Sequence, residues 1–187
     1  MMGKSKTPAP VKLVVGMFTA QVELFETVEE WLGHEFGPID YRTELLPFDH
    51  TTYYAAEFGE NLVRKFVTFA QLIDAGRLAE IKRFTNDLEM RLAAEGKRRI
   101  NLDPGYISLA KLVLASTKDH QHRLYLGQEI YGEVTLRFVK GSFRPWDWTY
   151  PDYGTEEYIA IFNHIRQLYL AQLREAEGKV THSLASM

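Results

Sequence analysis

The stretch VKLVVGMFTAQVELFETVEEWLGHEF, residues 11–36, decides how the chain begins to fold. Its first part, 11–18, is β-branched and almost continuously apolar, which predicts a strand covered on both faces. In 21–36 the apolar residues recur at helical spacing, and Gly37 followed by Pro38 ends that helix. The apolar stripe of the helix is Val22, Phe25, Val28, Trp31 and Leu32. The chain is therefore expected to open with a buried strand and an amphipathic helix.

The same alternation of strands and helices continues to residue 107. Residues 39–48 alternate apolar and polar side chains, and 62–69 reads as a further strand. Asp74 is placed to cap a helix that ends at Gly96, and 97–107 alternates again. The resulting order, β-α-β-β-α-β, is the ferredoxin-like pattern. It predicts an antiparallel sheet with both helices on one face.

The second half of the chain has a different pattern. Residues 108–117 read as a short helix or a buried apolar run, and 123–126, 130–139 and 142–148 read as a strand meander. Thr155 then caps a long final helix, with Glu156 and Glu157 in its first turn. The expected fold is one α+β domain, a ferredoxin-like β-α-β-β-α-β core extended by a C-terminal strand meander and a closing helix.

Domain limits follow from composition. We expect a disordered N-terminal tail at 1–10, a single domain at 11–176 and a flexible C-terminal tail at 177–187. No run approaches the roughly 20 apolar residues of a membrane span, and no secretory leader is visible, so a cytoplasmic location is expected.

Composition and absent motifs exclude several function classes. The 187 residues carry 22 Lys and Arg against 25 Asp and Glu, a formal charge of −3, so no nucleic-acid partner is expected. The absence of cysteine excludes disulfide frameworks, iron–sulfur clusters and thiol nucleophiles. No P-loop for GTP or ATP is present, nor a dinucleotide-binding, hydrolase-elbow or zincin motif.

The most distinctive stretch is KRRINLDPGYISLAKLVLASTKDH, residues 97–120. Asn101 and Asp103 would share the polar face of a strand, and Asp103-Pro104-Gly105 is turn chemistry at its end. Polar groups gathered there predict one wall of a ligand pocket. In the alternative interpretation, Asp103 caps a turn.

Two imidazoles follow closely. His120 and His122 would share one face of an extended strand, within reach of a single metal ion. Carboxylates from Asp119 or Glu133 would complete a nitrogen and oxygen site for zinc, manganese or iron. The alternative is a solvated pair of loop histidines, and the cofactor, a divalent metal on this hypothesis, is otherwise unknown.

The segment 131–138 predicts the opposite wall of the pocket. Alternation puts Tyr131, Glu133, Thr135 and Arg137 on one face, and Val134, Leu136 and Phe138 on the other. The polar row is either a plain solvent face or a pocket floor.

Two further patterns have competing interpretations. His50-Thr51-Thr52 fits the His-x-Thr motif of two-histidine phosphoesterases, but the comparable position, Glu133-Val134-Thr135, has a carboxylate in place of the second histidine. The aromatic stretch 143–153 either closes one end of a sheet or forms an interface.

These segments resemble the bacterial family catalogued as domain of unknown function 4416. The matching stretches are LPFDHTTYYAAEFG, KRRINLDPGY, LAKLVLASTKDHQHRLYLG, IYGEVTLRF and SFRPWDWTYPDY. The resemblance implies a compact bacterial cytoplasmic domain and supplies no catalytic residues. Some members carry the label "GTP-binding protein", for which this chain has no P-loop.

The leading functional hypothesis is a protein that binds or acts on a small anionic or phosphate-bearing metabolite. The predicted pocket gathers Asn101, Asp103, Lys118, Asp119, His120, His122, Glu133, Thr135 and Arg137. Lys118 and Arg137 would hold the anion, while Asp103, His122 or Glu133 would move a proton or bind a metal. The alternatives are a divergent two-histidine phosphoesterase and a non-catalytic interaction module, with a homodimer formed through the aromatics of 146–153.

Overall fold

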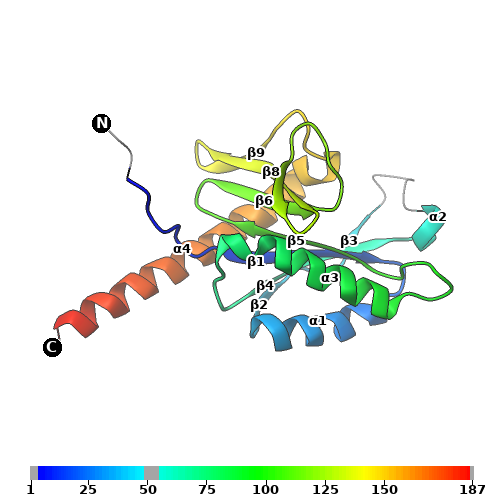
Figure 1. Cartoon of the computed structure of the whole chain (residues 1–187), viewed down its shortest axis with the longest axis horizontal. Coiled ribbons are helices and arrows are strands. Elements are labelled where there is room, and N and C mark those ends of the chain that lie inside the picture. The colour runs from blue at the N-terminus through cyan, green and yellow to red at the C-terminus, as the bar shows by residue number, and fades with distance from the viewer. Residues whose placement is uncertain (1–3, 49–54, 186–187) are drawn as a thin grey trace.

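One antiparallel sheet dominates the computed structural model, which describes residues 4–48 and 55–185 (Figure 1). The elements are β1 Lys12–Thr19, α1 Glu23–Phe36, β2 Ile39–Arg42, β3 Leu46–Pro47, α2 Ala55–Phe58, β4 Val63–Phe69, η1 Ala75–Arg77, α3 Leu78–Leu92, β5 Asn101–Ile107, β6 Lys111–Ser116, β7 Leu124–Gly127, β8 Ile130–Val139, β9 Ser142–Pro145, η2 Pro151–Gly154 and α4 Glu156–Ala185. The strand order is β2-β4-β1-β5-β6-β8-β7, with β3 also paired to β4 and β9 to β8. The chain is therefore an α+β protein with a large antiparallel sheet.

Helices α1 and α3 pack on the same face of the sheet, as predicted. Their apolar stripes meet the alternate residues of β1 and β5 in one core. That core is formed mainly by Leu13, Val15, Met17, Phe25, Val28, Leu32, Ile81, Leu88, Ile100 and Leu102. One predicted helix end is confirmed, since Gly37 follows α1 with a positive φ of 89°. Asp74 caps η1 instead of α3, because its side chain accepts a hydrogen bond from the Gly76 amide, and α3 ends at Leu92 instead of Gly96.

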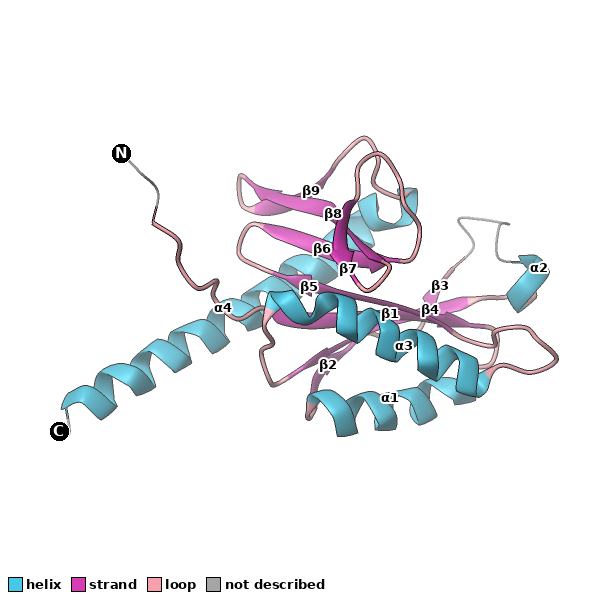
Figure 2. Ribbon diagram, in the orientation of Figure 1, coloured by secondary structure: helices cyan, strands magenta, loops and turns pink. Residues whose placement is uncertain are grey.

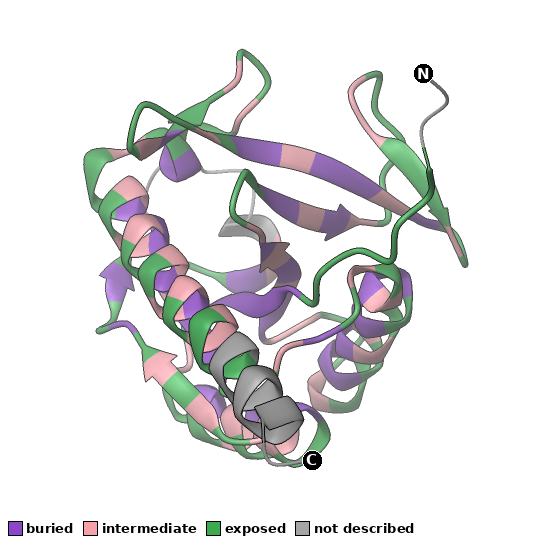
Figure 3. Cartoon of the chain, turned by 90° about the vertical axis from the view of Figure 1, so that its left-hand side faces the viewer, coloured by how far each residue is buried: buried purple, intermediate pink, exposed green. Residues whose placement is uncertain are grey.

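Helix α4 covers the opposite face, so the central strands are enclosed on both sides (Figure 3). Its buried stripe packs on Val14, Phe66 and Leu136 of the sheet. The stripe consists of Tyr158, Phe162, Ile165 and Tyr169. Thr155 caps the helix as expected, because its Oγ1 accepts from the Tyr158 amide at 3.3 Å. No helix in the described part of the chain is both long and apolar enough to cross a membrane.

Several predicted element boundaries were wrong. The strand expected at 39–48 is divided into β2 and β3. Between them, the Phe66 amide donates to the side-chain Oγ1 of Thr43, while the Thr43 amide donates to the Phe66 carbonyl. The strand expected at 97–107 starts only at Asn101. Residues 108–117 contain strand β6 and no helix. The domain limits and the tails remain predictions, and helix α4 runs to Ala185.

The meander contains a further correction. Leu112 pairs with Leu136, but Val113 pairs with Val134, so the register of β8 shifts at Thr135. A bulge adds one residue and reverses the alternation beyond it. Val134 consequently packs toward α3, whereas Leu136 and Phe138 pack toward α4. The predicted common face of Glu133 and Arg137 was therefore wrong.

Strands β5 and β6 stay together only briefly. They pair at three positions, from Gly105 opposite Leu114 to Ile107 opposite Leu112, and then separate. Beyond this point β5 follows β1, while β6 follows β8 (Figure 2). Pro104 lies next to the separation and has no N–H to donate to a neighbouring strand. The separation opens the sheet.

Replacing Gly105 with alanine is expected to lower the free energy of unfolding by about 2 kcal/mol. An added Cβ would lie 2.4 Å from the Val113 carbonyl oxygen, which is backbone and cannot rotate away. Urea denaturation of the two proteins measures the difference. Gly33→Ala is the control, since nothing lies within 4 Å of its Cβ and α1 gains a better helix former. Equal effects of both substitutions would contradict the expected clash.

Candidate functional site

A cavity of about 910 Å³ lies where β5 and β6 separate. We call it the split-strand cavity. Its lining includes Phe48, Glu57, Arg64, Lys82, Asn86, Arg98, Asn101, Asp103, Ser116, Lys118, His120, Arg123, Glu133, Tyr150, Asp152 and Tyr153. A volume in this range is typical of small-molecule sites. The cavity is the place where the structure brings distant polar residues together.

The floor of the split-strand cavity comes from three neighbouring strands. Across β4, β1 and β5, Arg64 is in register with Phe18 and Phe18 with Asn101. One row further, Gly16 of β1 is in register with Asp103. Residues in register share a face of an antiparallel sheet, so Arg64, Asn101 and Asp103 project to the same side. The predicted wall at Asn101 and Asp103 thus lies on the cavity.

Arg64 is the most buried cation of the cavity, with 3% of its surface exposed. Its guanidinium forms an ion pair with Asp152 of η2. Its Cζ also lies 3.9 Å from the ring centroid of Phe48, a cation–π contact. Its Nε, however, has no hydrogen-bond partner among the described residues. The Nε–H donor of this buried, permanently charged group therefore has no described acceptor.

Two more lining residues also have a buried donor without a described acceptor. The Asn101 amide oxygen accepts from Arg98 Nη1 at 2.8 Å, which fixes the amide orientation and leaves Nδ2 without an acceptor in the described structure. The Tyr153 hydroxyl also has no described partner. Burial raises the pKa of Tyr153 well above its usual value, so the hydroxyl keeps its proton. Three residues that line one cavity thus each have a buried donor without a described acceptor.

The wall next to Asn101 is held by its own ion pairs. Arg98 Nε and Nη2 donate to the two carboxylate oxygens of Glu57 at 2.7 and 2.8 Å. This pairing lowers the pKa of the Glu57 carboxyl. Lys82 Nζ donates to the Leu102 carbonyl at 2.7 Å and lies 4.0 Å from Asp103 Oδ1. Asp103 itself stays partly exposed, with 30% of its side chain accessible.

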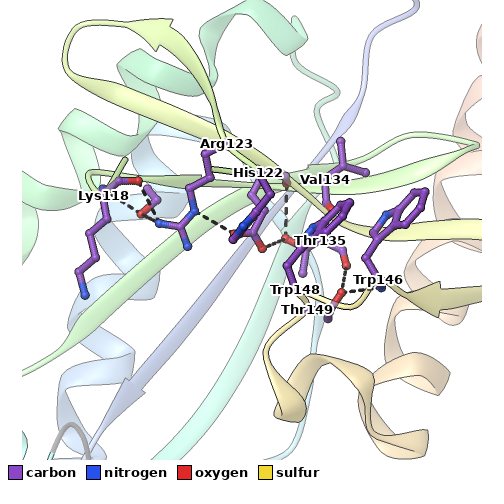
Figure 4. A network of polar contacts seen from close by, with 10 residues as sticks. Lys118, His122, Arg123, Val134, Thr135, Trp146, Trp148 and Thr149 are labelled. Atoms are coloured by element: carbon purple, nitrogen blue, oxygen red, sulfur yellow. Dashed lines mark hydrogen bonds and ion pairs between the residues drawn. The ribbon is translucent and has the colours of Figure 1, made fainter. Parts of the chain in front are cut away.

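The opposite wall is a polar network that includes His122, Arg123 and Thr135 (Figure 4). Its centre is the Glu133 carboxylate of β8. Glu133 is 2% exposed, and its Oε2 lies 2.9 Å from both His122 Nε2 and Arg123 Nε. Its Oε1 accepts from the Thr135 hydroxyl at 3.2 Å. Arg123 in turn donates to Ser116 Oγ and to the Lys118 carbonyl, at 2.8 and 3.0 Å. Glu133 therefore organises this wall.

The sequence candidates are only partly brought together. Asn101, Asp103, Lys118, His120 and Glu133 line the cavity, while Thr135 and His122 contact it through Glu133. Asp119 and Arg137 are exposed and do not line it. Because of the bulge at Thr135, Arg137 lies over the Trp146 ring, 4.1 Å from its centroid.

The two histidines lie close together, without a described third ligand. Their ring centroids are 5.8 Å apart, and His122 already contacts Glu133 through Nε2. In the ranges 4–48 and 55–185, no three histidine, aspartate or glutamate residues gather so that they could hold an ion. His50-Thr51-Thr52 lies outside the described residues, so the first phosphoesterase motif has no structural description.

The aromatic stretch 143–153 is divided between core and surface: Phe143 is fully buried, whereas Trp148 is 38% and Tyr150 48% exposed. Tyr153 is buried, and the Trp146 and Trp148 rings stack with centroids 5.0 Å apart. Trp148 stacks in turn on His122 at 5.5 Å, and its Nε1 donates to the Val134 carbonyl. The outer strand predicted at 142–148 ends at Pro145, because the Trp146 amide donates to Thr149 in a turn.

Sequence reasoning missed several cavity residues, including Glu57 and Arg123. Arg64, Lys82 and Arg98 lie on elements predicted as ordinary strand and helix, and Asp152 belongs to a motif noted only for its aromatics. One signal was available for Arg64, because a charged residue inside the apolar strand VRKFVTF needs a buried partner.

Comparison with known proteins gives one match. A family model described as "Domain of unknown function (DUF4416)" matches residues 9–169. No curated protein and no solved structure matches the chain. The family description carries no activity, so function has to be argued from the split-strand cavity.

Proposed function

We propose that this chain, which belongs to the DUF4416 family, binds a small anionic metabolite in the split-strand cavity. The observation that carries the proposal is that three residues lining one cavity each have a buried donor without a described acceptor: Arg64 Nε, Asn101 Nδ2 and Tyr153 Oη. Each buried donor without an acceptor costs about 1–3 kcal/mol. A ligand with several acceptor oxygens would remove that cost.

The charge of the lining favours an anion over a neutral ligand. Among the described lining residues, five Lys or Arg face four Asp or Glu. Three of the carboxylates already hold an arginine: Glu57, Glu133 and Asp152. A carboxylate or phosphate oxygen would accept from the leftover donors without competing for those pairs.

We also infer a ferredoxin-like classification for residues 11–107. The order β5-β1-β4-β2, all antiparallel, and the position of α1 and α3 on one face support it. With this classification, β6 extends the sheet of the ferredoxin-like core beyond β5. The split-strand cavity then lies where the core meets its C-terminal extension.

Thermal unfolding with small anions tests the proposal. Inorganic phosphate, a short dicarboxylate and a sugar phosphate serve as probes, each against sodium chloride at equal ionic strength. We expect at least one probe to raise the melting temperature saturably, since a ligand at about 100 times its Kd adds about 2.7 kcal/mol to stability. Asn101→Leu should remove the shift.

Arg77→Ala is the matched control. Arg77 forms an exposed pair with Glu80 and does not line the cavity, so the anion shift should persist in this variant. The proposal is wrong when no probe gives a saturable shift, or when Asn101→Leu and Arg77→Ala respond alike.

A further inference from the structure

Strand β7, Leu124–Gly127, forms one end of the sheet and pairs only with β8 in the described structure. Three consecutive apolar residues of this strand are exposed to solvent. Leu124 is 74% exposed, Tyr125 63% and Leu126 42%. The outer N–H and C=O groups of such a strand are a template for another strand.

Two other edge strands of this sheet are protected. β2 carries Asp40 and Arg42, and β9 carries Arg144 and Pro145. Charges and proline at an edge prevent pairing with another chain. β7 has neither, and the neighbouring Arg123 is turned inward to Glu133 with 4% of its side chain exposed. The outer edge of β7 therefore lacks the features that prevent pairing, and a further strand can add to it.

We propose that β7 pairs with β7 of a second copy of this chain, antiparallel and across a two-fold axis at Tyr125. In that register each Leu124 is opposite Leu126 of the other copy, and the two Tyr125 residues face each other. Arg123 is opposite Gly127, so no like charges meet. The edge is thus complementary to itself, as a two-fold interface requires.

None of residues 124–127 lines the split-strand cavity, although Arg123 next to them does, and the interface does not use the aromatics of 146–153. A four-residue strand covers less than the roughly 800 Å² per partner of a standard interface. We therefore expect a reversible dimer, visible in sedimentation velocity when the full chain is raised to several hundred micromolar.

Cross-linking tests the register. Because the chain has no cysteine, Tyr125→Cys introduces one thiol that faces its own copy across the axis. Two residues directly opposite in an antiparallel pair lie within the Cα separation of a disulfide. We expect a dimer on mild oxidation that thiol reductant reverses. Met90→Cys, on the equally exposed Met90 of α3, should give much less dimer.

A charge variant tests the edge itself. Tyr125→Lys puts two ammonium groups opposite each other and should raise the dimer dissociation constant at least about tenfold. Met90→Lys should leave it unchanged, and circular dichroism checks that both variants fold. The proposal is overturned by a wild-type chain that stays monomeric throughout, or by a dimer that Tyr125→Lys does not weaken. Equal cross-linking at positions 125 and 90 would also overturn it.

Discussion

Replacing Lys12 with methionine is expected to lower the free energy of unfolding by about 3 kcal/mol. Lys12 is fully buried in β1, and its Nζ donates to Asp40 Oδ2, the Phe69 carbonyl and Gln172 Oε1 at 2.7–2.9 Å. Methionine fills a similar space but leaves these acceptors without a donor. The contact also joins α4 to the sheet, so urea denaturation should show one cooperative, weaker transition.

This loss should depend on pH. Burial lowers the pKa of Lys12, so the folded chain releases that proton at a lower pH than the unfolded chain. Between the two values the unfolded state binds more protons, and the Lys12 contribution to the free energy of unfolding rises with pH. The difference between wild type and Lys12→Met should therefore be larger at about pH 10 than at about pH 7.

Arg77→Ala provides the comparison for an exposed cation. Its ion pair with Glu80 is open to solvent, so its loss should cost at most about 1 kcal/mol. A Lys12→Met protein as stable as Arg77→Ala would show that the buried contact contributes nothing beyond its packing.

The parts of the fold that sequence could predict are those set by local pattern. Spacing of apolar residues located β1, α1, α3 and α4, and the capping residue Thr155 behaves as expected. Each of these features depends on neighbours within a few residues, which a single sequence displays. The family was also recognisable, because its motifs are contiguous.

The parts that could not be predicted depend on contacts between distant residues. The sequence around Thr135 contains no signal for the extra residue that β8 has there relative to β6. This bulge nevertheless moves Arg137 away from the cavity. Likewise, Arg64 and Asp152 are 88 positions apart, and only the folded chain pairs them. The candidate site was thus predicted on the β5 and β8 sides and missed on the β4 and η2 sides.

Replacing Arg64 with methionine is expected to lower the free energy of unfolding by about 4 kcal/mol and to abolish the anion-induced rise in melting temperature. The first effect arises because the Asp152 side chain, 9% exposed, would stay buried without its cation. The second arises because the cavity would lose a donor that no described residue satisfies. Both are measured on the same protein, by urea denaturation and by thermal unfolding with phosphate.

The double variant Arg64→Met with Asp152→Asn separates these two effects. Asparagine retains Oδ1, which accepts the Tyr153 amide at 3.0 Å, and it removes the unpaired charge. Replacing both members of a buried pair is often nearly neutral, so stability should return to within about 1–2 kcal/mol of wild type. Anion binding should stay lost, because the Arg64 donor is still missing. Recovery of binding together with stability would show that Arg64 acts only through the fold and that the anion is held elsewhere.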